Sequence, residues 1–124
     1  MPANPRYVRL PPPLASRSEA ALRAQFAQRL VEAHPDSSYT TRAPARLLAI
    51  PVLEVDLHAD GSVRGIKVLR KPSTGTQATA LAIAAVWRAA PYGDVSRLPK
   101  PWRVVETFLF DDHLRFKPRT LDDD

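Results

Sequence analysis

Residues 50–72 read IPVLEVDLHADGSVRGIKVLRKP, and this stretch decides the fold class of the chain. Over residues 53–58, within a predicted strand that spans 48–58, apolar side chains alternate with polar ones, which is the pattern of a strand with one buried face. Asp60-Gly61 follows, a pair that tolerates positive φ and is typical of a tight hairpin turn. The sequence therefore predicts an antiparallel pair of strands over 48–58 and 62–70.

A helix is predicted over residues 16–34, upstream of this hairpin. Ser16 and Glu19 have the spacing of a capping box, in which each side chain satisfies a backbone amide of the other. Pro35 ends the helix, because the residue before a proline avoids the helical region. The predicted helix has one apolar stripe, formed by Leu22, Phe26, Leu30 and Ala33.

A second helix is predicted after the hairpin, up to Pro91. Thr74 and Gln77 again have capping-box spacing, and the run that follows is rich in alanine, the best helix former. We expect its core face to consist of Ala80, Ile83, Trp87 and Ala90.

Residues 102–110 are the most β-prone stretch of the chain and predict a third strand. After Asp111-Asp112, residues 114–117 either form a short fourth strand or continue as an edge. We therefore predict an α+β fold with a small antiparallel sheet of three or four strands, covered by two helices. Its order is β-β-α-β with an extra N-terminal helix.

The length of 124 residues suits a single domain. Residues 1–15 hold five of the 13 prolines and predict a flexible leader. Residues 16–118 form the α+β domain. Residues 119–124 end in three aspartates and predict a flexible acidic tail.

The composition excludes several kinds of site. There is no cysteine, so disulfides, Cys-ligated zinc and thiol chemistry are absent. The N-terminus lacks the apolar core of a signal peptide, and no apolar run is long enough to span a bilayer. The sequence as written predicts a cytoplasmic location, which would change to periplasmic if an upstream segment is missing.

The net charge of +5 is unevenly distributed along the chain. Residues 1–46 hold seven arginines and three acidic residues, whereas the remainder is nearly balanced. Such asymmetry suits a solvated basic face, an acidic partner or nucleic acid. Basic and aromatic residues also alternate around residues 87–103, which would suit stacking of single-stranded nucleic acid if the rings were exposed. Nucleic-acid binding is therefore the alternative function.

The second half of the chain has an order of motifs that resembles the C-terminal domain of the TonB family. A strand leads through a D-G turn to a second strand with a basic end, followed by a helix, a proline-containing loop and an aromatic last strand. The resemblance covers about residues 45–112. It rests on Val55, Asp60, Gly61, Val63, Val68, Ala82, Ala85, Trp87, Arg88, Pro91, Pro101, Val105 and Phe110.

The resemblance implies a non-catalytic interaction module that binds an extended segment of a partner, such as an envelope protein, by adding a strand to its sheet edge. The edge that it implies consists of Val104, Val105, Glu106, Thr107, Phe108, Leu109 and Phe110. The flanking loop that it implies includes Thr41, Arg42, Pro44 and Arg46. Such an edge could also pair with a second copy, so a monomer or an edge-paired homodimer is expected. The membrane anchor and long spacer of energy-transducing members are not found in this sequence.

Residues that could support chemistry are few. Glu54, Asp56 and His58 share one strand face and could hold a cation or act as acid and base, but we favour the explanation that they are polar groups on a solvated strand face. Residues 111–113, Asp-Asp-His, suit an acidic turn or a small metal site. No nucleotide-binding, nucleophile-elbow or zinc motif occurs. We therefore predict no enzymatic activity, no catalytic or metal-binding residues and no cofactor.

Overall fold

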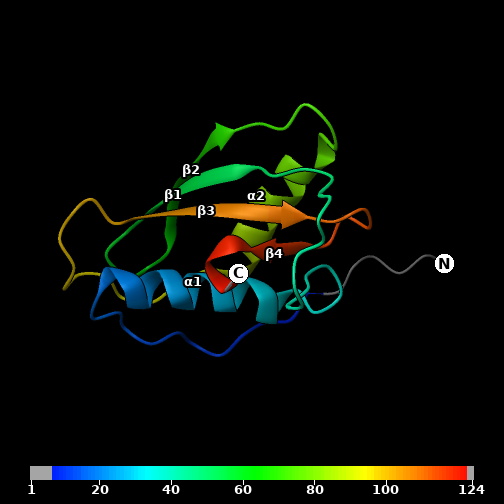
Figure 1. Ribbon diagram of the computed structural model, residues 1–124. Coiled ribbons are helices and arrows are strands. Elements are labelled where there is room, and N and C mark those ends of the chain that lie inside the picture. Colours follow the sequence, from blue (N-terminus) through cyan, green and yellow to red (C-terminus); the bar gives the residue numbers. More distant parts are fainter. Residues whose placement is uncertain (1–6, 123–124) are drawn as a thin grey trace.

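The computed structural model describes residues 7–122, which form one open sheet and two helices (Figure 1). This is the α+β fold that the sequence predicts. No helix within these residues has both the length and the apolar character that crossing a membrane requires. The elements are α1 (Glu19–Ala33), β1 (Val52–Leu57), β2 (Val63–Arg70), α2 (Gln77–Ala89), β3 (Arg103–Phe110), β4 (Phe116–Pro118) and the short 3-10 helix η1 (Arg119–Leu121).

The four strands are antiparallel and lie in the order β2-β1-β3-β4. β1 and β2 form the predicted hairpin, with Gly61 at φ +87° in its turn. α2 then carries the chain across, and β3 pairs with the other side of β1, so that Val55 lies opposite Val104. The chain next turns back, and β4 pairs with the end of β3. The fourth strand that the sequence left open is therefore present.

Both helices cover the same face of the sheet, which gives the molecule two layers. Along β1 every second side chain is buried, beginning with Leu53, and these side chains share one core with the inner faces of α1 and α2. α1 contacts β3 and β4, whereas α2 contacts β2. Val52, Glu54 and Asp56 are half-buried on the opposite face, which we call the helix-free face because α1 and α2 leave it uncovered.

α1 has the predicted apolar stripe but a different cap. All four side chains of the stripe are at most 3% exposed. The cap is Ser18, whose hydroxyl accepts a hydrogen bond from the Ala21 amide at 3.0 Å, so the cap predicted at Ser16 was two residues too early. Ser16 is instead buried, and its amide donates to the Asp94 carbonyl at 3.0 Å.

α2 buries a different face from the predicted one. Trp87, predicted in the core, is 52% exposed. The physical reason is that small side chains let a helix lie close to a sheet, whereas an indole would hold it away. The Thr74 cap is also corrected: its hydroxyl donates to the Leu48 carbonyl at 3.1 Å, and the cap position is Thr76. The buried residues of α2 are Ala78, Thr79, Ala82, Ala85, Val86 and Ala89.

The described part of the Pro-rich leader, residues 7–15, lies against α1 and is hydrogen-bonded to it. Its composition had predicted a flexible segment without such contacts. The Gln25 side chain hydrogen-bonds both the amide and the carbonyl of Leu14, at 3.1 and 2.8 Å. Arg29, which is itself buried, donates to the Pro11 carbonyl at 2.9 Å. Extended backbone leaves its polar groups unpaired, and side chains of α1 satisfy them. The rest of the leader and the last two residues of the predicted tail lie outside the described residues.

Candidate functional site

The residues predicted as the sheet edge lie in β3, which is an interior strand. β1 pairs with Arg103–Thr107, and β4 pairs with Phe108–Phe110. β3 is thus not the last strand of the sheet, and the expected edge is corrected over Phe108–Phe110, where β4 lies on its outer side. The physical cause is the turn at Asp111, whose carboxylate accepts hydrogen bonds from the amides of His113 and Arg115, both at 2.9 Å, and brings the chain back beside β3.

The side chains of β3 alternate between the core and the helix-free face. Val104, Phe108 and Phe110 are core residues. Val105 is 45% exposed on the helix-free face, and Thr107 is half-buried beside it. β3 can therefore offer a partner a few side chains on that face, whereas on its outer side β4 covers only the peptide groups of Phe108–Phe110.

Glu106 binds one amide on the outer side of β3, just beyond the end of β4. Its side chain is 3% exposed, and its Oε2 accepts hydrogen bonds from the amide of Thr107 at 2.9 Å and from that of Thr120 in η1 at 3.4 Å. Its Oε1 has no partner among residues 7–122. Burial raises the pKa of this carboxyl above its ordinary value, against the opposing effect of the hydrogen bonds.

The free edge of the sheet is β2, at the opposite side. The hydrogen bonds between β1 and β3 show that odd-numbered residues of β1 turn their peptide groups toward β3, so the even-numbered ones face β2. These even-numbered residues lie opposite Gly65 and Lys67. The peptide groups of Ile66 and Val68 therefore point away from the sheet, and no described segment pairs with them.

The β2 edge is strongly basic. Arg64, Lys67, Arg70 and Lys71 are all exposed. The ammonium group of Lys67 lies 3.9 Å from a carboxylate oxygen of Glu54, a long contact from an exposed lysine that contributes little to stability. Register shifts occur at both ends of the pairing between β1 and β2. Bulges and basic residues are the means by which edge strands avoid pairing with copies of themselves.

The carboxylates predicted as a possible cation site are used in ion pairs. The Nε of Arg103 lies 2.8 Å from Asp56 and 3.5 Å from Glu54, across the pairing of β1 with β3. His58 lies beyond the end of β1 and is exposed. Among residues 7–122, no group of three acidic or histidine side chains could hold a metal ion.

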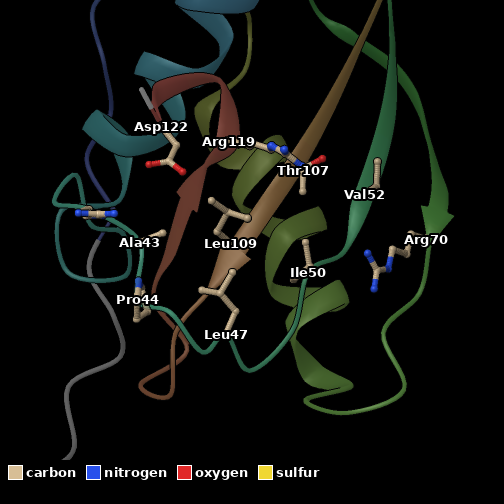
Figure 2. A pocket seen from close by; sticks show the side chains of 11 residues that line it. Ala43, Pro44, Leu47, Ile50, Val52, Arg70, Thr107, Leu109, Arg119 and Asp122 are labelled. Atoms are coloured by element: carbon tan, nitrogen blue, oxygen red, sulfur yellow. The ribbon is translucent and has the colours of Figure 1, made fainter. Parts of the chain in front are cut away.

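A hollow of about 450 Å³ lies on the helix-free face, next to the end of β2 (Figure 2). Figure 2 shows its apolar floor, to which Leu47, Ile50 and Leu109 contribute. Arg70, the last residue of β2, and Arg119 of η1 lie on its sides, so the hollow continues the basic character of the β2 edge.

The flanking loop predicted from the resemblance lies beside this hollow. Arg42 and Pro44 line it. The carbonyl of Thr41 accepts a hydrogen bond at 3.1 Å from the buried ammonium group of Lys117. Arg46 lines a neighbouring, smaller hollow. The loop and the outer residues of β3 do meet, but on a face of the sheet and not at its edge.

The aromatic residues weighed for nucleic-acid binding do not form one stacking surface. Tyr92 is completely buried, and its hydroxyl donates to the Val86 carbonyl at 2.7 Å. Trp102 is half-buried and donates its indole N–H to the Leu98 carbonyl at 3.0 Å. Of the three rings, Trp87 alone is largely exposed.

Comparison with known proteins finds no family model, no curated protein and no solved structure that matches this chain.

Sequence reasoning missed the β2 edge, although a signal for it was present. Residues 64–71 carry four basic side chains, three within the predicted strand and one just after it, and charges of this kind are common on edges. His34, considered below, carried no such signal, because a lone histidine before a proline has no distinguishing pattern.

Proposed function

We propose that this chain is a non-catalytic interaction module of the TonB C-terminal-domain type, which binds an acidic, extended segment of a partner protein by strand addition to β2. The observation that carries the proposal is the outer side of β2. This strand has eight residues, it is the last in the sheet, and no described segment covers it. A strand in this position presents a row of hydrogen-bonding groups to an incoming peptide.

Charge selects the kind of partner. Four exposed basic side chains on and next to β2 would repel the same four on a second copy, which disfavours the edge-paired homodimer. The same charges favour an acidic segment. Val68 lies opposite Leu53 on the helix side, whereas Lys67 lies opposite Glu54 on the helix-free face. An added strand that alternates apolar and acidic residues would therefore match both faces of β2.

The resemblance to the TonB family supports this kind of binding through the order of elements. Val52 to Phe110 runs β-β-α-β with antiparallel pairing throughout, which is the order that the resemblance implies. In this proposal the added strand lies on β2 in place of the last strand. An envelope protein with an acidic, extended segment is the partner class that follows from the resemblance and the charge together.

The proposal is tested by titrating the isotope-labelled protein with a synthetic peptide of alternating valine and glutamate, long enough to span β2. We expect the amide signals of Ile66 and Val68 to shift most, because their peptide groups would form the new hydrogen bonds. The double substitution Lys67→Glu and Arg70→Glu should weaken binding by about tenfold or more, since it reverses two charges that face the peptide.

Two controls separate strand addition from simple charge attraction. A peptide that is N-methylated at the amides facing β2 keeps its charge but loses its donors, so its binding should be strongly reduced. Arg97→Glu, an exposed charge reversal outside β2, should leave binding almost unchanged. Equal binding of both peptides would contradict strand addition. Tighter, strongly salt-dependent binding of a single-stranded oligonucleotide would favour the nucleic-acid alternative.

A further inference from the structure

A second hollow, of about 660 Å³, lies away from the β2 edge, between the end of α1, the outer part of α2 and the turn before β4. Its size falls within the range of small-molecule sites, which are mostly apolar with a few polar groups. Leu81, Ala85, Phe110, Leu114 and Phe116 supply apolar parts of its wall. We call it the His34 hollow, after the histidine in that wall.

His34 presents an acceptor without a partner. The residue is 2% exposed, and its Nδ1 lies 2.7 Å from the Leu30 carbonyl oxygen. A carbonyl oxygen only accepts, so Nδ1 carries the proton and Nε2 is left with its lone pair. No donor within residues 7–122 reaches this Nε2. Buried polar atoms in proteins are almost always paired, which makes an unpaired acceptor beside a hollow informative.

The ring of His34 is held neutral, so that Nε2 stays an acceptor. Burial lowers the pKa of His34, and the nearby positive charge of Arg88 lowers it further, against the opposing effect of the hydrogen bond to Leu30. The group that this nitrogen can take up is therefore a hydroxyl or an N–H, and not a second acceptor.

Arg88 gives the hollow a positive charge that no carboxylate of the described residues offsets in an ion pair. Its guanidinium lies 5.1 Å from the centre of the Tyr7 ring, which leaves its N–H groups available to an anion. The other arginine in the wall, Arg115, is held by Asp111 at 2.9 Å. Asp36 is the one acidic residue in the wall.

We infer that the His34 hollow binds a small aromatic carboxylate that also carries a hydroxyl group, with the carboxylate on Arg88, the hydroxyl donating to His34 Nε2 and the ring against the apolar wall. This site is independent of the proposed binding of a peptide to β2. Neither the sequence motifs nor the resemblance points to it.

Three related probes test the assignment by calorimetry and by the ring-nitrogen signals of the three histidines. 4-Hydroxyphenylacetate has both groups, phenylacetate lacks the hydroxyl, and 4-hydroxyphenylacetamide lacks the charge. We expect the first to bind about tenfold more tightly than either of the others, because each lacks one hydrogen bond to a charged or buried group. Only the probes with a hydroxyl should move the Nε2 signal of His34.

Arg88→Gln should remove the preference for the acid over the amide, whereas Arg97→Gln, an exposed arginine elsewhere, should not. The Nε2 signal needs no substitution at His34, so the test does not depend on a variant that fails to fold. The inference is overturned if all three probes bind equally, if none binds, or if the Nε2 signal stays unchanged while the acid binds.

Discussion

Glu106 provides the hydrogen-bond acceptor for one amide of β3 that β4 is too short to reach. β4 pairs only with the last three residues of β3, and the Thr107 amide just before them bonds to the Glu106 carboxylate at 2.9 Å. A buried carboxylate is costly unless all its lone pairs are used, and here Oε1 has no partner among the described residues. The Glu106 side chain therefore satisfies the Thr107 amide, but its buried carboxylate lowers the stability of the folded protein at neutral pH.

We predict that Glu106→Gln stabilises the protein at neutral pH. Folding raises the pKa of this carboxyl, so the folded state holds the proton more strongly than the unfolded state does. The corresponding stability is present below the ordinary pKa and is lost as the pH rises through the folded-state pKa. A neutral amide keeps an acceptor oxygen and should raise the free energy of unfolding at pH 7 by about 1 kcal/mol.

Urea unfolding at about pH 4 and at pH 7 measures this effect. The Glu106→Gln variant should show a different change in stability between the two pH values from that of the unsubstituted protein. The Glu32→Gln variant, an exposed change on α1, should show the same change as the unsubstituted protein. An unaltered pH dependence in Glu106→Gln would count against a buried, proton-binding Glu106.

Gly61 is required by its conformation and by its surroundings. Its φ is +87°, and a Cβ atom there would overlap the backbone of Gly93. The loop that contains Gly93 is held in place by the Tyr92 amide, which donates a 2.8 Å hydrogen bond to the Gly61 carbonyl. We predict that Gly61→Ala destabilises by about 3 kcal/mol or more. Gly65→Ala is the matched control, because a Cβ there has no atom within 4 Å. Thermal unfolding of both variants tests this, and equal melting temperatures would refute it.

At the scale of elements, the two outer strands of the sheet differ in length and in whether other parts of the chain lie beside them. β4 is short and is followed at once by η1, which contacts both α1 and β3. β2 is long, basic and uncovered within the described residues. The sheet is thus covered by its own chain over Phe108–Phe110 on one side, whereas β2 is open along its whole length on the other and offers the longer edge to a partner.

We predict an alternating pattern of amide hydrogen exchange along β2. The amides of Ile66 and Val68 should exchange quickly, because they point away from β1, whereas those of Gly65 and Lys67 should be protected. Mass-spectrometric or NMR exchange measurements on the free protein test this. Uniform protection along β2 would mean that something already covers the edge and would remove the basis of the proposed function.

At the scale of the whole molecule, Gln25 joins three segments that are distant in sequence. Its side chain bonds the amide and the carbonyl of Leu14 in the leader, and it donates to the Tyr92 carbonyl at 2.8 Å in the loop after α2. We predict that Gln25→Ala lowers the free energy of unfolding by about 2 kcal/mol, since three hydrogen bonds are lost.

Gln28→Ala, an exposed change on the same helix, should alter stability by less than about 0.5 kcal/mol. Limited proteolysis adds a local measurement, because loss of Gln25 should make residues 7–15 easier to cleave. Equal stability and equal cleavage of the two variants would show that the leader does not depend on Gln25.

Local patterns were sufficient for much of the fold. The strand alternation around Leu53, the turn at Gly61 and the apolar stripe of α1 are properties of adjacent residues, and all three are confirmed. The inner face of α2 was predicted wrongly, because an alanine-rich helix has several faces of similar hydrophobicity and Trp87 misled the assignment. The choice among such faces depends on how closely the helix can approach the sheet.

The sequence by itself determined the strand pair, both helices and the antiparallel order, because periodicity and turn residues act over short distances. Only the tertiary structure decided which strand is the free edge. That depended on Asp111 turning the chain back beside β3, on Glu106 binding the Thr107 amide beyond the end of β4, and on β2 being left last in the sheet. Pairing between distant strands is set by the packing of the whole chain, and no single stretch of residues encodes it.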